Sequence, residues 1–210
     1  AIIGPLNFSY SAYKIAPRDD GDIILPAPPP AIVINEFLAD PAADLPGDAN
    51  GDGVRDSGDD EFIELVNNSD ADVDISGWTI ADGYDVRHIF PAGTIVAANC
   101  NIVIFGGGTP TGEFGGAVVQ TASSGSLGLN NSGDTITLND GATDLVVVAY
   151  GSEGGYDQSL TRDPDITGEF VGHSEATGSG GALFSPGTMV DGSQFSGCPI
   201  AFGVCGVGLW

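Results

Sequence analysis

Short apolar stretches alternate with turns rich in glycine, asparagine and aspartate along most of the chain. No stretch keeps the 3.6-residue helical period for more than a turn, whereas several are rich in β-branched residues. Short strands joined by such turns are typical of an all-β sandwich. The pattern predicts strands within residues 31–40, 61–68, 73–83, 87–107 and 143–151, and a hairpin over residues 126–140.

The stretch TDLVVVAYG, residues 143–151, is the most strongly β-branched of these. A continuous apolar run is typical of a strand that is covered on both faces, whereas a half-covered strand alternates. We therefore expect this strand to be buried on both faces.

The N-terminal residues read differently from the body. Leu6, Phe8 and Tyr10 alternate with polar residues, which predicts a single strand. A proline-rich stretch follows and is typical of a stiff linker. We predict an extended arm over residues 1–31, a body over residues 32–187 and an apolar C-terminal tail over residues 188–210.

An acidic insert, residues 44–60, follows the first predicted strand of the body. Its spacing matches the EF-hand calcium loop, in which oxygen ligands recur at alternate positions and a glycine permits the sharp bend at position 6. That glycine is Gly53, and the carbonyl of the next residue supplies position 7. The insert predicts a Ca²⁺ site whose ligands are Asp48, Asn50, Asp52, Val54, Asp56 and Asp59.

Further candidate ligands are Asp60, Glu61 and Glu36. The alternative interpretation is a solvated acidic turn without an ion. Pro41 and Pro46 break the approach to the loop, so no amphipathic helix precedes it. We therefore expect a structural clip rather than a helix-opening switch.

Several segments resemble the lamin tail domain family, in particular its secreted bacterial versions. The resemblance is carried by IVINEFLADP, DEFIELVNNSDADVDISGWTIADG, IFPAGTIVAANCNIVIF, LGLNNSGDTITLNDGATDLVVVAYG, SLTRDPD and SPG, in family order over residues 32–187. It implies an immunoglobulin-like β-sandwich that serves as an interaction module. Similar bacterial domains often carry an acidic calcium insert between the first two strands.

Three features of the body have individual interpretations. Trp78 is expected to anchor the core, and Arg162 is expected to pair with a carboxylate. Asp70, Asp72 and Asp74 indicate either a second ion site or, as we prefer, the exposed entrance to a strand.

The charge of the chain limits its partners. It has 29 acidic and 5 basic residues, for a formal net charge of −24. Nucleic-acid binding needs Lys and Arg to neutralise phosphates, so neither nucleic acid nor an anionic membrane surface is expected as a partner. The composition favours cation binding instead. No apolar run is long enough for a membrane span.

The compartment is inferred from the start of the chain, its cysteines and the calcium loop. The chain begins at Ala1, which we interpret as a mature product after leader removal, and calcium loops suit the extracellular calcium concentration. We therefore expect a secreted, extracellular or cell-surface protein. Cys198 and Cys205 are candidates for a disulfide, with Cys100 left over; the alternative interpretation is that all three are small buried residues.

No pattern of a catalytic site is found. His88 and His173 lie in separate segments, and the motifs of nucleotide binding, zinc binding and the nucleophile elbow are missing from the sequence. We predict that the protein is not an enzyme.

Two functions remain. The first is a structural subunit whose N-terminal strand adds to a sheet of a neighbouring copy and so builds a filament or surface layer. Its assembly residues would be Leu6, Phe8, Tyr10, Lys14 and Arg18. The second is a monomeric adhesive module that binds a protein or glycan, for which Trp78, Tyr84, Tyr150 and Tyr156 are the aromatic candidates.

Overall fold

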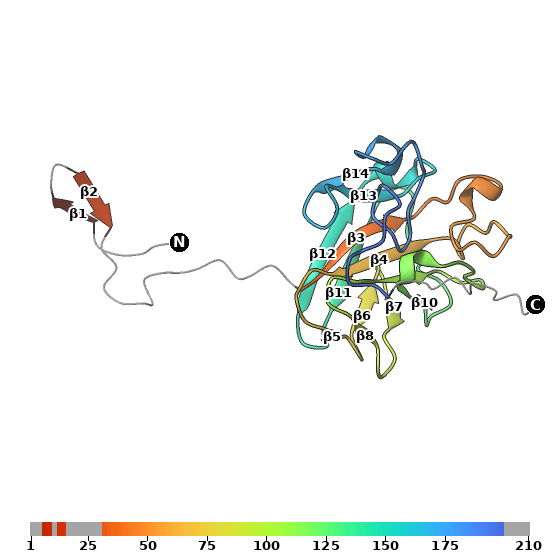
Figure 1. The fold of residues 1–210 in the computed structure, drawn as a ribbon, viewed down its shortest axis with the longest axis horizontal. Helices are drawn as coiled ribbons and strands as arrows, with labels where there is room; N and C mark the ends of the chain where they lie inside the picture. Colours follow the sequence, from red (N-terminus) through yellow and green to blue (C-terminus); the bar gives the residue numbers. More distant parts are fainter. Residues whose placement is uncertain (1–5, 10–11, 16–30, 200–210) are drawn as a thin grey trace, which may run out of the picture. The chain divides into compact units, whose positions relative to one another are not determined.

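The computed structural model describes residues 6–9, 12–15 and 31–199 (Figure 1). The chain divides into two compact units after Pro30. In the N-terminal unit, β1 (Leu6–Ser9) pairs antiparallel with β2 (Ala12–Ile15). The prediction of a single strand was therefore wrong. The hairpin could not be predicted, because Tyr10 and Ser11, which lie between the strands in the sequence, include no Gly or Asn of the kind that marks a tight hairpin turn.

Of the predicted assembly residues, Leu6 and Phe8 lie in β1 and Lys14 lies in β2. Tyr10 and Arg18 lie outside the described residues, so the structure does not place them.

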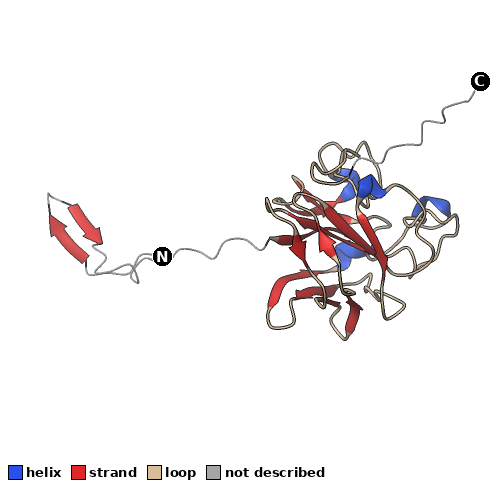
Figure 2. Ribbon diagram, turned by 60° about the horizontal axis from the view of Figure 1, so that its bottom comes forward, coloured by secondary structure: helices blue, strands red, loops and turns tan. Residues whose placement is uncertain are grey.

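The second unit is a sandwich of two main sheets, which confirms the predicted all-β fold (Figures 1 and 2). The larger sheet has six strands in the order β10-β9-β4-β3-β13-β14, antiparallel except for the β10–β9 pair. These strands are β3 (Ile32–Leu38), β4 (Phe62–Asn67), β9 (Asn101–Phe105), β10 (Val118–Thr121), β13 (Leu160–Asp163) and β14 (Glu169–Gly172).

The smaller main sheet has the antiparallel order β12-β11-β6-β7, and β5 pairs with β8 beside it. Four short 3-10 turns lie in the loops (blue in Figure 2). The strands are β5 (Val73–Asp74), β6 (Thr79–Ala81), β7 (Val86–Ile89), β8 (Ile95–Val96), β11 (Asp134–Asn139) and β12 (Asp144–Tyr150). The turns are η2 (Leu45–Gly47), η3 (Phe114–Gly116), η4 (Ser152–Gly155) and η5 (His173–Glu175).

The core fills the space between the two main sheets. Ile63, Leu65 and Ile102 of the larger sheet pack with Ile80 and Ile136 of the smaller one. The outer face of the larger sheet is also covered, by two further apolar clusters. All residues of β4 and β9 are therefore buried, which explains why these strands do not alternate between apolar and polar residues.

Burial of β12 differs from the prediction. This strand lies at the edge of the smaller sheet, and its residues alternate between exposed and buried at its C-terminal end. The prediction of burial on both faces was wrong for β12. A run of β-branched residues indicates that a strand is apolar, but it does not indicate whether the strand is central or at an edge of the sheet.

The predicted hairpin over residues 126–140 was also wrong. Residues 126–130 form no strand, and β11 pairs with β6 and β12 instead. Strands β10, β13 and β14 were not predicted, because each has only four residues, and β10 is the parallel strand of the sheet.

The C-terminal part of the described chain packs on the outer face of the larger sheet. Cys198 forms a disulfide with Cys100, and Phe195 joins the same apolar cluster. Residues 188–199, predicted as part of a separate tail, therefore belong to the body. The candidate Cys198–Cys205 pairing is corrected, because Cys198 is bonded to Cys100; Cys205 lies outside the described residues. Spacing along the chain could not reveal a partner that is 98 residues away.

Within the described residues, no helix has both the length and the apolar character needed to cross a membrane.

Candidate functional site

The acidic insert forms a closed loop between β3 and β4. Arg55 anchors it, because its Nε donates to the carbonyl oxygen of Ala42 at 2.8 Å and its guanidinium also donates to the carbonyl of Pro41. Both carbonyls lie just after β3. The only arginine in the insert therefore ties the loop to the sheet and does not neutralise a loop carboxylate by a hydrogen bond.

The first half of the insert is shaped by bonds between side chains and its own backbone. The amide of Gly53 donates to Oδ2 of Asp48 at 2.9 Å, which links positions 6 and 1 of the predicted calcium loop. Gly53 has φ of +88°, a conformation that favours glycine. Asn50 and Asp52 each accept an amide from the residue two positions later. Local geometry thus turns the first three candidate ligands toward the loop interior.

Two polar atoms of the loop are buried without a partner. These are Oδ1 of Asp48 and Nδ2 of Asn50, and Asn50 is fully buried. A buried polar atom without a hydrogen bond costs free energy. For a carboxylate oxygen at position 1, a cation is the partner that fits. Oδ1 of Asp48 therefore fits a calcium ion at this end of the loop, whereas Nδ2 of Asn50 is a hydrogen-bond donor and cannot bind one.

A pair of glycines closes one side of the loop. A Cβ atom on Gly107 would lie 2.1 Å from Oδ1 of Asp59. One on Gly108 would lie 2.4 Å from Nδ2 of Asn50 and 2.7 Å from Oδ2 of Asp52. Any larger residue would displace these side chains. The segment after β9 is thus a wall that holds three candidate ligands from a distance of more than 40 residues along the chain.

The loop carboxylates influence one another. Burial raises the pKa of Asp59, and the neighbouring Asp56 and Asp52 raise it further. The pKa of Asp56 is lowered, because its carboxylate accepts the amides of Gly58 and Asp59. Repulsion among Asp52, Asp56 and Asp59 is what a bound cation would relieve.

The three additional candidates have other roles in this structure. Asp60 is buried and accepts the amides of Asn50 and Asp56, so it braces the loop from within. Glu61 accepts the amide of Leu129, and burial raises its pKa to about 8. Glu36 lies in the buried network described below. Among the described residues, no three His, Cys, Asp or Glu side chains are already arranged around one metal position.

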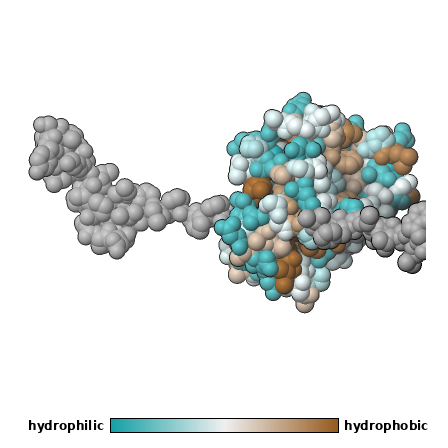
Figure 3. Space-filling view, viewed as in Figure 1, coloured by the Kyte–Doolittle hydropathy of each residue, from teal (hydrophilic) through white to brown (hydrophobic). Residues whose placement is uncertain are grey.

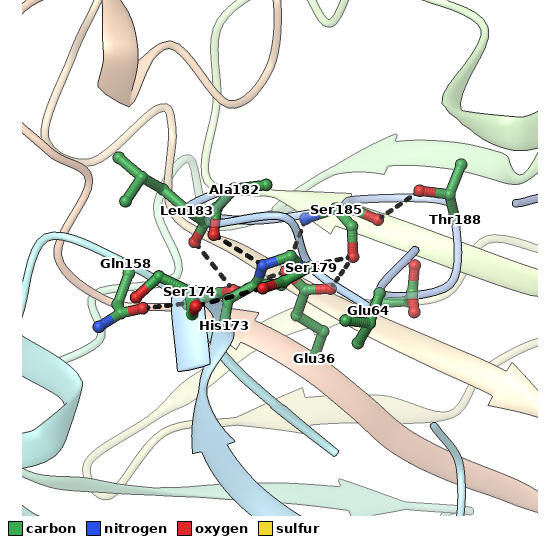
Figure 4. Close-up of polar contacts among 12 residues, drawn as sticks. Glu36, Glu64, Gln158, His173, Ser174, Ser179, Ala182, Leu183, Ser185 and Thr188 are labelled. Atoms are coloured by element: carbon green, nitrogen blue, oxygen red, sulfur yellow. Dashed lines mark hydrogen bonds and ion pairs between the residues drawn. The ribbon is translucent and has the colours of Figure 1, made fainter. Parts of the chain in front are cut away.

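A second polar site lies in the interior, where Ser185 bridges Glu36 and His173 (Figure 4). Oγ of Ser185 is 2.7 Å from Oε2 of Glu36 and 2.9 Å from Nε2 of His173. Oε1 of Glu36 accepts the hydroxyl of Ser159 and the amide of Ser185. Glu36 and His173 are both fully buried.

The number of hydrogens shared among Glu36, Ser185 and His173 defines the net charge of this buried trio. Nδ1 of His173 faces the carbonyl oxygen of Ala182 at 2.9 Å, so it carries a hydrogen. The Ser185 hydroxyl has one hydrogen to give. If it donates to Glu36, Nε2 must also be protonated; if it donates to Nε2, Glu36 must be protonated. Either arrangement leaves Glu36, Ser185 and His173 with no net charge, which makes their burial affordable.

Glu64 is the second carboxylate of this network. It accepts the side-chain amides of Asn35 and Asn101 at 2.9 Å each and the backbone amide of Gly187 at 2.7 Å. Burial raises the pKa of Glu64 well above its usual value, and Glu36 raises it further. Burial also raises the pKa of Glu36, whereas His173 opposes that rise.

The network joins residues that the sequence presents separately. Asn35, Glu36, Glu64 and Ser159 carried the family resemblance, and the structure brings them together. Asn101, His173, Ser185 and Gly187 were not predicted as their partners. The available signal was SPG, residues 185–187, which was seen as part of the resemblance but had no assigned role.

Other predicted residues have clear places. Trp78 packs against the core, as expected. Within the described part of the chain, Arg162 hydrogen-bonds to no carboxylate, so the expected pairing was wrong there: it donates to the carbonyls of Ile34 and Gly168 and lies 4.3 Å from the ring centre of Phe170. The carbonyl oxygens and the aromatic ring stabilise the positive charge of the guanidinium without a salt bridge.

The serine–histidine–glutamate trio does not have the arrangement of a hydrolytic triad. In a triad the imidazole lies between the acid and the nucleophile, whereas here the serine lies between the acid and the imidazole. The histidine and the glutamate are also fully buried. No ligand-sized pocket is found among the described residues. The trio therefore serves as a link between β3 and the C-terminal segment.

Comparison with known sequences agrees with this architecture. The lamin tail domain family matches residues 26–152, which is more than half of the chain. The chain belongs to the lamin tail domain family, whose members have an immunoglobulin-like fold. A search of curated proteins found no match. Strands β13 and β14 lie beyond the matched residues but complete the larger sheet.

Proposed function

We propose that this protein is an extracellular, calcium-stabilised structural subunit that assembles with other copies of itself through its N-terminal unit. The observation that carries this proposal is the separation of the chain into a small hairpin and a complete sandwich. An isolated two-stranded hairpin is at best marginally stable in water. A second sheet that accepts it would supply the missing stabilisation, and a head-to-tail contact of this kind builds filaments.

Calcium is proposed as the ion that completes the acidic loop. Support comes from the partnerless Oδ1 of Asp48, the Gly53–Asp48 bond and the glycine wall at Gly107 and Gly108. Because the loop connects two central strands of the larger sheet, an ion there would stabilise the whole sandwich. At 100 times its Kd, one bound ion adds about 2.7 kcal/mol to the free energy of unfolding.

The extracellular location is supported by the disulfide between Cys100 and Cys198. Disulfides persist in oxidising compartments and are rare where thiols are kept reduced. The proposed calcium site also supports an extracellular location, because calcium is abundant outside cells.

We further propose that the protein is not an enzyme. The family is an immunoglobulin-like structural fold, and the buried trio has no access for a substrate. The acidic surface disfavours nucleic acid, because phosphate binding needs basic residues.

The second candidate function is a monomeric binding module. Tyr84 and Tyr156 are 80% and 63% exposed, and they flank one turn, because Gly83 donates to Asp134 and Gly155 packs against Asn131. Two exposed aromatic residues that follow the ends of one turn suit a glycan or peptide. Tyr150 and Trp78 do not contribute, because both pack into the core.

Sedimentation velocity of the full chain tests the proposal. In the presence of calcium, we expect a distribution of large species that shifts to monomer when residues 1–18 are deleted. A monomer at all concentrations, with and without the deletion, would reject self-assembly and favour the binding module.

A further inference from the structure

The outer edge of β12 is an unusual place for an apolar strand. Natural edge strands are protected by lysine, proline, shortness or covering loops, because unpaired backbone groups attract other strands. β12 is seven residues long, DLVVVAY, and has neither lysine nor proline. Val147 is 57% exposed. This strand has the composition of a central strand at a position with only one neighbour, β11.

The hydrogen bonds of β12 confirm that this edge is open within the described residues. It pairs with β11 from Tyr150, opposite Asp134, to Asp144, opposite Asn139. Among the described residues, no backbone group of residues 145–149 bonds outside this pairing. A bulge at Leu145 interrupts the ladder, which leaves Val146–Tyr150 as a regular, five-residue edge. Figure 1 shows β12 at the side of the body, outside β11.

The other three edges of the main sheets are less suited to a partner. β7, β10 and β14 have four residues each. The outer side of β7 is already used, because Ile89 donates its amide to Ser123 and Arg87 accepts the amide of Ser124. On the face shown in Figure 3, apolar residues occur in separate groups rather than in one patch.

The N-terminal hairpin is the occupant that matches this edge. In its ladder Leu6 pairs with Ile15 and Phe8 pairs with Tyr13, so two of its four residue pairs join apolar or aromatic residues. Its four-residue strands fit the five-residue edge. The fifteen residues 16–30 can reach at most about 50 Å, which is enough for a neighbouring copy.

The charge distribution favours the hairpin, rather than the β12 strand of a second copy, as the occupant of this edge. Three of the 29 acidic residues and two of the five basic residues precede residue 31, which leaves the rest of the chain with 26 acids against three arginines. Two such bodies repel each other at close range. Residues 1–18, in contrast, contain Lys14 and Arg18 and no acidic residue. The hairpin is therefore the part of the chain that can approach a body without repulsion.

We propose that the outer edge of β12 is the acceptor site for the N-terminal hairpin of a second copy, which extends the β7-β6-β11-β12 sheet by two strands. This inference rests on the proposed self-assembly and specifies where it occurs. The contact consists of main-chain hydrogen bonds along Val146–Tyr150, and the exposed Val147 lies within it.

The test is a pair of matched substitutions in the full chain, Val147→Lys on β12 and Ile95→Lys on β8. Both residues are exposed aliphatics, at 57% and 51%. A lysine on the acceptor edge should raise the concentration at half-assembly by about tenfold or more, whereas Ile95→Lys should leave it unchanged. In parallel, hydrogen exchange of wild-type protein should show the amides of Val146–Tyr150 becoming slower on assembly. This measurement stays informative if a variant folds poorly.

The outcomes separate the two proposals. Assembly that is insensitive to Val147→Lys, with unchanged exchange in β12, overturns the acceptor site; the proposed function still stands if deletion of residues 1–18 abolishes assembly. Assembly that needs β12 but survives this deletion overturns the hairpin as the occupant and indicates β12–β12 pairing. A wild-type protein that stays monomeric overturns both proposals.

Discussion

Ser185 binds Glu36 twice, through its amide at 2.8 Å and its hydroxyl at 2.7 Å, although the two residues are 149 positions apart. This contact fastens the C-terminal segment to β3, a central strand of the larger sheet. Ser185 lies beyond the residues that match the family, whereas Glu36 lies within them.

Replacing Ser185 with alanine should lower the free energy of unfolding by about 1–3 kcal/mol, because Oε2 of Glu36 loses a buried hydrogen-bond donor. Chemical denaturation measures the change. Ser196→Ala is the matched control, an exposed serine of the same segment, and should have little effect. Equal stability of the two variants would show that the hydrogen bonds of Ser185 contribute nothing to the free energy of unfolding.

The double substitution Asp48→Ala with Asp52→Ala should abolish the effect of calcium on the melting temperature. In the wild type, we expect calcium to raise the melting temperature and a chelator to reverse the rise. Asp70→Ala with Glu113→Ala removes two exposed acids outside the loop and controls for net charge. A wild-type melting temperature that is the same in calcium and in chelator would support the alternative interpretation, a solvated acidic turn without an ion.

Removing the disulfide by Cys100→Ser with Cys198→Ser should cost about 2–5 kcal/mol of unfolding free energy. The bond fixes residues 188–199 on the larger sheet, so proteolysis should release this segment first. Unchanged stability and cleavage would mean that the apolar contacts of Phe195 hold the segment alone.

The buried carboxylates predict a definite dependence of stability on pH. The pKa values of Glu36 and Glu64 are raised in the folded state, so folding favours their protonated forms. Their stabilising effect is complete below the unfolded value of about 4.5 and is lost as the pH rises through the folded values. We therefore expect unfolding free energy, measured in saturating calcium, to fall as the pH rises from 4.5.

Glu64→Gln separates this effect from general acidic repulsion. The variant should come closest to the wild type in stability at low pH, where Glu64 is protonated and glutamine is its neutral isostere. Its stability should also fall less steeply with pH than that of the wild type. Parallel pH profiles for the two proteins would contradict a raised pKa of Glu64.

The sequence was most informative where interactions are local. The spacing of Asp48, Asn50 and Asp52 was readable because a tight loop brings close neighbours together, and the structure places their bonds within the same loop. The glycine wall was not readable, since nothing in the sequence links Gly107 to Asp59. The sandwich itself followed from strand length and turn composition.

Other features depend on topology, which a single sequence does not reveal. Residues 143–151 look more apolar than residues 61–68, which contain two glutamates and two asparagines, yet β4 is buried in the centre of its sheet and β12 lies at an edge. Likewise, His173 is an isolated histidine in the sequence and part of a shared-proton trio in the fold. The order of the strands in each sheet distinguishes β4 from β12, and contacts between distant segments define the role of His173.

Electron microscopy of the full chain in calcium, beside a sample that lacks residues 1–18, tests self-assembly most directly. The account predicts filaments of repeating bodies in the first sample and separate particles in the second. Separate, uniform particles in both samples would contradict it, and the exposed Tyr84 and Tyr156 would then become the place to search for a ligand.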